Sequence, residues 1–205
     1  MIARLQRPAL SATLIAARQK QPLSFLVAKP PDPTRLGLTA GLARRTFGEF
    51  MSIYLLALLI GVVAGLRTMT APAAVSIGAA AGWLPLSGTW AAFMGFRFTP
   101  YVAGLLALVE FVGDQLPSTP SRKVPQQFGA RIVSGAFCGA VLGTVGGAML
   151  PGLVAGVIGA IIGTLGGYEA RKRLVAAIGG KDLPIALLED AVAVLLALWV
   201  VSSVS

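Results

Sequence analysis

The sequence predicts an all-α protein, a polytopic bundle of about five transmembrane helices. Hydrophobic residues make up 56% of the chain and charged residues only 12%, and the mean hydropathy is +0.80. This composition lies outside the usual balance of soluble proteins. Five long apolar runs follow residue 50, and glycine recurs every fourth residue in two of them. Small residues at this spacing let helices approach closely in lipid.

The five apolar runs define the expected spans. They cover residues 52–82, 100–116, 128–149, 152–170 and 183–202. All but the first are close to the roughly 20 residues that a helix needs to cross a bilayer. Because Pro72 has no N–H to donate to the carbonyl of Thr68, we expect the first run to break near Arg67–Pro72. One broken span is our main prediction; two short membrane segments, which would move the amino terminus to the other side, are the alternative.

The glycine ladders predict that spans three and four pack together as a hairpin. Their members are Gly135, Gly139, Gly143, Gly147, Gly159, Gly163 and Gly167. In a water-exposed helix each glycine would cost about 1 kcal/mol relative to alanine. Close helix packing in lipid compensates for that cost, so we interpret these glycines as packing residues.

The loops between the runs predict the topology. Trp83 and Trp90 indicate an interfacial loop at 83–99, because tryptophan prefers the headgroup level. Two basic loops, 117–127 and 171–182, are separated by two spans and must therefore face the same side. The positive-inside rule predicts that this side is cytoplasmic.

Residues 1–50 differ from the rest of the chain in charge. They carry eight basic and two acidic side chains, whereas residues 51–205 carry nine and six. The basic residues of this segment are not interleaved with aromatic ones, and the segment has no recognition motif, so we expect no nucleic-acid partner. Because Met51 is followed directly by the first run, we interpret 1–50 as the product of a wrongly assigned start, and 51–205 as the transmembrane domain. A basic cytoplasmic tail and an organellar transit peptide are the alternatives.

Charged side chains inside the apolar runs mark the candidate site. Each costs at least about 2.5 to 3.5 kcal/mol near the bilayer centre and demands a partner. Arg67 lies in the first run, Glu110 and Asp114 in the second, and Glu189 and Asp190 in the fifth. Glu110 and Glu189 are each seven residues from a flanking loop, which places both at a depth of about 10 Å. We expect Arg67 near Glu110 or Glu189, beside a cavity that reaches the cytoplasmic face.

Two interpretations of this acidic layer stay open. The charges could form ion pairs that fix helix register, or they could line a polar cavity for a small solute, a proton or a hard cation. In the second case, Thr68 and Thr70 at the helix break would present helix ends of opposite partial charge, as in transporters. Because the chain has no histidine and a single cysteine, Cys138, we expect no metal centre and no cofactor.

Three further polar features carry weaker predictions. The hydroxyl-rich loop with Ser118, Thr119, Ser121 and Arg122 is a candidate anion or lipid-headgroup site. A turn with capping hydroxyls is the alternative. Arg131 opens the third span, where we expect its side chain to reach the membrane surface. Glu169 is expected to pair with a nearby arginine.

Several segments in order also resemble a known family. They are Gly65–Val75, Glu110–Arg122, Ala130–Ala136, Gly166–Arg171 and Leu188–Ala191. Together they are similar to the bacterial multi-pass membrane family known as domain of unknown function 4126. The resemblance covers about residues 52–202. It implies a bacterial inner-membrane location and supplies no substrate.

The sequence favours a small-solute or ion transporter, or a channel-like unit. A membrane scaffold or assembly protein is the alternative, because glycine-ladder helices associate, and a second copy of the chain is a candidate partner. The chain has no phosphate loop, no Gly-x-Ser-x-Gly elbow and no histidine-based metal site, so we do not expect an enzyme. A lipid-modifying enzyme that uses a cation held by carboxylates ranks third.

Overall fold

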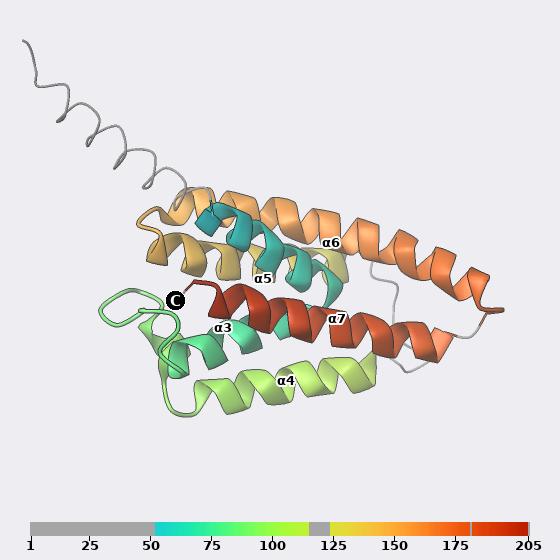
Figure 1. Ribbon diagram of the computed structural model, residues 1–205, viewed down its shortest axis with the longest axis horizontal. Helices are drawn as coiled ribbons and strands as arrows, with labels where there is room; N and C mark the ends of the chain where they lie inside the picture. Colours follow the sequence, from blue (N-terminus) through green and yellow to red (C-terminus); the bar gives the residue numbers. More distant parts are fainter. Residues whose placement is uncertain (1–51, 115–123, 181, 205) are drawn as a thin grey trace, which may run out of the picture. The chain divides into compact units, whose positions relative to one another are not determined.

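The protein is all-α over the residues that the computed structural model describes, which are 52–114, 124–180 and 182–204. Every regular element in these ranges is a helix, as the composition predicts (Figure 1). The α-helices are Ser52–Leu66, α3 (Thr70–Ala80), α4 (Thr99–Gly113), α5 (Pro125–Val145), α6 (Met149–Ala177) and α7 (Asp182–Ser202), and η2 (Ala92–Gly95) is a short 3-10 helix. The predictions for residues 1–50 lie outside the described residues.

Three of the helices are long and apolar enough to cross a membrane. They are α5, α6 and α7, with 21, 29 and 21 residues. At 1.5 Å per residue, 21 residues extend about 31 Å, which matches a hydrocarbon layer of roughly 30 Å. The Ser52–Leu66 helix, α3 and α4 are also apolar but shorter, with lengths between 10 and 17 residues.

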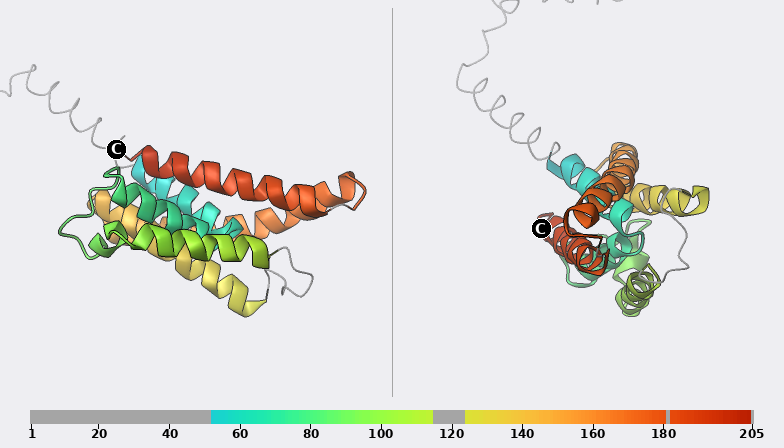
Figure 2. Two further views of the ribbon diagram at one scale, coloured as in Figure 1. Left: turned by 90° about the horizontal axis from the view of Figure 1, so that it is seen from below. Right: turned by 90° about the vertical axis from the view of Figure 1, so that its right-hand side faces the viewer.

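The first apolar run forms a helical hairpin. The Ser52–Leu66 helix ends before Arg67, and α3 runs back in the opposite direction (Figures 1 and 2). Ile53, at the start of the hairpin, lies against Gly146, just after the end of α5. Gly78, near the end of the hairpin, lies against Val201, near the end of α7. The prediction of one broken span is therefore wrong, because the run folds as two short antiparallel helices; the side of the membrane that the alternative of two short segments gives to the amino terminus stays a prediction.

Pro72 explains where the helix breaks, but it does not explain why the chain reverses direction there. The expected break is confirmed, because the helix stops at Leu66 and a new one starts at Thr70. Pro72 lies in the first turn of α3, where a missing N–H costs little. A proline defines where a helix can start, but the direction of the new helix depends on tertiary contacts that no local pattern encodes.

The hairpin is buried within the bundle, whereas α4 is peripheral. In the end-on view of Figure 2, the hairpin lies among α5, α6 and α7, with α4 at the edge. Ala57, Ile60 and Val63 of its first helix and Val75 of α3 are completely buried. In α4 only Ala107 is buried. The surface of the bundle is thus strongly apolar along α4, as expected for a surface in contact with lipid.

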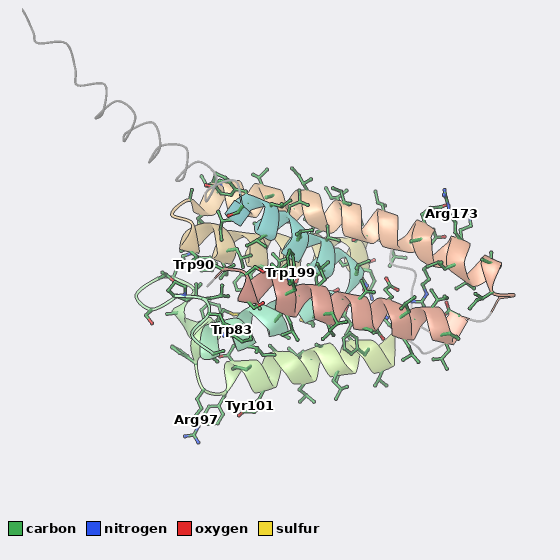
Figure 3. The ribbon with its side chains drawn as sticks, viewed as in Figure 1. Trp83, Trp90, Arg97, Tyr101, Arg173 and Trp199 are labelled. Carbon is green, nitrogen blue, oxygen red and sulfur yellow. The ribbon has the colours of Figure 1, made fainter. Side chains whose placement is uncertain are left out.

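The two ends of the bundle differ in chemistry. Trp83, Trp90, Arg97 and Tyr101 gather where α3 ends and α4 begins, and Arg173 lies at the opposite end (Figure 3). Trp83 and Trp90 belong to the irregular segment 81–98, as the interfacial-loop prediction requires.

Glycine brings α5 and α6 into backbone contact. A Cβ on Gly139 or Gly143 of α5 would collide with the backbone of Gly152 on α6. A Cβ on Gly135 would collide with the carbonyl oxygen of Gly156. These contacts occur because three small residues of α5 share one face with a spacing of four.

A second glycine face of α6 packs on the hairpin. Gly159 and Gly163 lie against the backbone of Leu58 and Val62, so their partner is the Ser52–Leu66 helix and not α5. Gly167 is half-buried and lines a cavity between α6 and α7. The pattern predicts close approach, but it does not specify which helix approaches.

Gly147 is a turn residue and makes no helix-packing contact, contrary to the prediction. Its φ is +80°, and the space where a Cβ would lie is open. Its N–H donates to the carbonyl of Thr144 at 3.1 Å, and the N–H of Ala148 donates to Gly143 at 2.8 Å. This is how a glycine just past a helix end satisfies the last carbonyls.

The second basic loop is shorter than predicted. Arg171, Lys172 and Arg173 belong to α6, which continues to Ala177, and the connection to α7 is only residues 178–181. A helix of 29 residues exceeds the length needed to cross the apolar layer, so these charged turns can extend beyond it.

We predict that Gly156→Ala lowers the midpoint of thermal unfolding in detergent. The added methyl would meet the carbonyl of Gly135 and force α5 and α6 apart. The matched control is Gly166→Ala on the same helix, where the Cβ enters open space. That variant should unfold at or above the wild-type midpoint, because alanine has the higher helix propensity. Equal midpoints for both variants would contradict the packing account.

Candidate functional site

The turn of the hairpin, Arg67–Met69, is buried inside the bundle. Arg67 is 0% exposed and Thr68 is 7% exposed. Here the C-terminus of one helix and the N-terminus of the next leave backbone carbonyls and N–H groups without helical partners. In an apolar environment each unpaired group costs several kcal/mol, so this turn requires side-chain partners.

Arg131 of α5 satisfies the carbonyl end of the turn. Its Nη1 donates to the carbonyls of Gly65 at 2.9 Å and Leu66 at 2.6 Å. A cation at a helix C-terminus is also favoured by the helix dipole. Arg131 is 1% exposed, so the expectation that it reaches the membrane surface is wrong. The carbonyls inside the bundle offer the guanidinium a closer set of acceptors.

Glu110 of α4 satisfies the N–H end of the turn. Its two carboxylate oxygens accept the N–H of Thr68 at 2.6 Å and the N–H of Met69 at 2.7 Å. Met69 precedes α3 and provides no side-chain cap of its own. The carboxylate therefore takes the place of the missing cap, where the helix dipole favours a negative charge.

Two hydroxyl groups donate to further backbone carbonyls at the turn. Ser134 Oγ donates to the carbonyl of Thr68 at 2.5 Å, which is the acceptor that Pro72 cannot serve. Thr164 Oγ1 lies 2.7 Å from the carbonyl of Ala160 and 3.2 Å from that of Gly65. Sequence reasoning missed both residues. For Ser134, the available signal was a polar side chain one helical turn after Arg131 within a run of small apolar residues; for Thr164, it was a polar side chain next to Gly163 of the glycine ladder.

The side chain of Arg67 joins α4 to α7. Its Nη1 donates to Asp114 Oδ2, and its Nη2 lies 2.5 Å from Asp190 Oδ1 without the alignment of a hydrogen bond. Its Cζ also lies 5.7 Å from the centre of the Phe111 ring. We call Arg67, Asp114 and Asp190 the Arg67 triad. The expected arginine and carboxylates do come together, but Arg67 pairs with the neighbours of Glu110 and Glu189 in place of those residues themselves.

Glu189 belongs to a separate ion cluster at the junction of α6 and α7. Its Oε2 lies 3.3 Å from Arg171 Nη1, and Arg171 also pairs with Asp182 at 2.6 Å. Successive residues of a helix point about 100° apart, so Asp190 can face the hairpin while Glu189 faces α6. The predicted acidic layer thus divides into two groups. The expected arginine partner of Glu169 is Arg173, at 2.8 Å.

The remaining predicted site residues do not join the triad through any hydrogen bond in the described structure. Thr70 opens α3 and is 4% exposed, and its Oγ1 has no hydrogen-bond partner among the described residues. Ser118, Thr119, Ser121 and Arg122 lie outside the described residues.

An open cavity of about 370 Å³ reaches the turn of the hairpin beside α4. Its polar lining residues are Thr68, Glu110, Asp114 and Gln127, and Met69, Gly113 and Ala130 complete its wall. Among the described residues, two carboxylates and no cation line it, so the cavity favours positively charged occupants. It adjoins the end of α4 and the first turns of α5, at the opposite end of the bundle from Trp83 and Trp90.

The charges around the turn do not balance. Within the part of the chain that the structure describes, Glu110, Asp114 and Asp190 carry three carboxylates, whereas Arg67 and Arg131 supply two guanidinium groups. Arg131 Nη2 is 4.0 Å from Glu110 Oε1 and 3.8 Å from Asp114 Oδ2. Among the described residues, no group of three or more histidine, cysteine or acidic side chains is arranged to hold a metal ion.

No protein-family model, curated protein or solved structure matches the chain. The resemblance to the family of domain of unknown function 4126 stays a prediction. Functional conclusions therefore depend on the geometry of the hairpin turn and its charges.

We predict that Ser134→Ala lowers the free energy of unfolding by about 1–3 kcal/mol, because the buried carbonyl of Thr68 loses its donor. The control is Ser203→Ala, which removes an exposed hydroxyl that donates to Trp199. That change should shift stability by less than about 0.5 kcal/mol. Chemical denaturation of both variants in the same detergent measures the difference. An equal loss in both would mean that the Thr68 carbonyl has another partner.

Proposed function

We propose that the chain is a multi-pass inner-membrane protein in which the hairpin enters the membrane and returns to the same face. In this arrangement α5, α6 and α7 cross the bilayer, α4 runs alongside them, and the first two helices form a re-entrant segment. The three long apolar helices and the bacterial family resemblance support this location. Irregular backbone at membrane depth is tolerated where protein or a cavity surrounds it, which fits the buried turn.

We place the ends of α4 and α6 on the cytoplasmic side. Arg171, Lys172 and Arg173 lie at that end, and the positive-inside rule favours it. The segment 81–98 with Trp83 and Trp90 is then external. Both ends of the hairpin also lie on the external side.

Within this membrane domain, we propose a site that binds and passes a proton or a small cation. One observation carries the proposal. An open acidic cavity leads to the break between the two helices of the hairpin, where two backbone N–H groups donate to the carboxylate of Glu110 on the neighbouring α4. Interrupted helices with charged partners at their ends are typical of transporter binding sites. The carboxylates of Glu110 and Asp114 contribute to both the cavity wall and the turn, so an occupant of the cavity would compete directly for them.

A membrane scaffold is the second candidate function. The observation that favours it is that Arg67, Glu110, Asp114 and Asp190 all have protein partners, as expected of charges that only fix helix register. The exposed apolar surface of α4 would then serve association with other membrane helices or with a second copy. We do not propose an enzymatic activity.

The transport proposal predicts that the purified protein, reconstituted in lipid vesicles, dissipates a gradient of protons or of a small monovalent cation. Asp114→Asn removes a carboxylate from the cavity and should lower the flux at least tenfold. The matched control is Asp182→Asn, which removes an exposed carboxylate that is paired with Arg171 outside the cavity. Its flux should stay within twofold of wild type. Fluorescent indicators of internal pH and cation concentration measure the rates.

Absence of flux across protons and a panel of small cations, in vesicles that hold folded protein, would contradict transport. If Asp114→Asn also lowers the thermal unfolding midpoint in that case, the scaffold is the better conclusion. Flux that Asp114→Asn leaves unchanged would mean that ions take a route other than this cavity.

A further inference from the structure

The Arg67 triad contains more negative charge than its single guanidinium can neutralise. Arg67 is fully buried, and both aspartates compete for it, Asp114 from the end of α4 and Asp190 from the middle of α7. Asp190 is eight residues beyond the start of α7, at a depth of about 12 Å. Arg131 also lies close to Asp114 and Glu110, so among the described residues three carboxylates face two guanidinium groups, and one negative charge is left uncompensated in a medium of low dielectric constant.

We propose that the Arg67 triad is a proton-binding site, with Asp190 as the carboxyl group that holds the proton. This inference deepens the proposed function by naming the ion that the site takes. The chemistry requires no second reactant: a proton from water joins the Asp190 carboxylate to give the neutral acid, and the reverse step returns it to water. Arg67 then remains as the charged partner of Asp114 alone.

The surroundings of the two aspartates favour Asp190 as the proton acceptor. Asp114 has a second cation nearby, because Arg131 Nη2 is 3.8 Å from its Oδ2. Among the described residues, Asp190 forms an ion pair with Arg67, whereas its chain neighbour Glu189 adds negative charge. The charge of Glu110, the remaining carboxylate on α4, is stabilised by two backbone N–H groups at the start of α3.

Two buried polar atoms support the same assignment. Asp190 Oδ1 and Arg67 Nε are both buried and have no hydrogen-bond partner in the described structure. Asp190 is 8% exposed and Arg67 is 0% exposed, so neither atom is satisfied by bulk water. Buried polar groups are nearly always paired, and an unpaired buried carboxylate oxygen is a position where a bound proton, a water or an ion can be accommodated.

Protonation of Asp190 would change how α4 is held. Helix α4 buries only Ala107, and its last turn is attached to the hairpin through Glu110 and Asp114. When Asp190 is neutral, Arg67 belongs to Asp114 and holds this turn. When Asp190 loses its proton, the guanidinium is shared and the attachment of α4 weakens, at the wall of the acidic cavity. Protonation of Asp190 therefore controls how firmly α4 is held at the wall of the acidic cavity.

The test is infrared spectroscopy of the full-length protein in lipid vesicles as the pH is raised from neutral. The wild type should show the carbonyl band of a neutral carboxylic acid at neutral pH, and the band should disappear reversibly in alkaline solution. Labelling of aspartate side chains with carbon-13 should shift this band, which separates aspartate from glutamate. This measurement needs no substitution and therefore does not depend on whether a variant folds.

Three variants assign the band. Asp190→Asn and Asp114→Asn should each abolish it, because either change leaves one carboxylate for one guanidinium. Asp182→Asn is the matched control on α7 and should retain the band in full. Circular dichroism and the thermal unfolding midpoint check that each variant is folded.

The proposal is overturned if the folded wild type shows no neutral aspartate at neutral pH, or if the band persists in folded Asp190→Asn. The vesicle flux assay separates this inference from the proposed function. A titrating band without flux of any ion would retain the proton site and reject transport. Cation flux with no neutral aspartate would retain transport and reject the proton site.

Discussion

The structure depends on one constraint, which is that the backbone at the turn of a buried hairpin must find hydrogen-bond partners without water. Two helix ends meet at Arg67–Met69, so carbonyls and N–H groups are exposed together. Arg131 takes two carbonyls, Glu110 takes two N–H groups, and Ser134 takes the carbonyl that Pro72 leaves. Each partner has the charge or donor that the local helix dipole favours. These partners of the turn's backbone are side chains of α4 and α5.

This requirement explains the arrangement of the helices around the hairpin. Arg131 and Ser134 can reach the turn only if α5 packs beside it, and Glu110 requires the end of α4 to meet the start of α3. Glycine on two faces of α6 brings α5 and the Ser52–Leu66 helix close enough for these contacts. Arg67 then connects the turn to α4 and α7 through Asp114 and Asp190. The contacts that satisfy the backbone also bring five charged side chains together. The turn that must be stabilised for folding is therefore also the candidate ion site.

The sequence predicts the helical class, the helix positions and the gathering of charge, because each depends on local composition and on the high cost of a charge in lipid. It also predicts the break at Pro72. It does not predict the reversal at Arg67, because direction after a break is set by tertiary contacts. For the same reason, Arg131 was expected at the surface and Gly147 in a helix contact. A pattern shows that a guanidinium needs acceptors, but it does not show that the carbonyls of Gly65 and Leu66 lie nearer than water. Asp190 and Glu189 point about 100° apart around α7, and sequence spacing alone does not tell which of the two faces Arg67.

The re-entrant hairpin is the central claim, and sidedness of its two ends tests it most directly. Ser52→Cys and Ser87→Cys place thiols at exposed positions just inside the start and just beyond the end of the hairpin, in a Cys138→Ala background. A membrane-impermeant maleimide added to spheroplasts that express each variant reports which side is accessible, with Lys172→Cys at the far end of α6 as the reference for the other side. The hairpin predicts that the two serine positions react from the same side and that Lys172→Cys reacts only after the membrane is opened. Labelling of Ser52→Cys and Ser87→Cys from opposite sides would mean that the first apolar run crosses the membrane once, and would contradict the account.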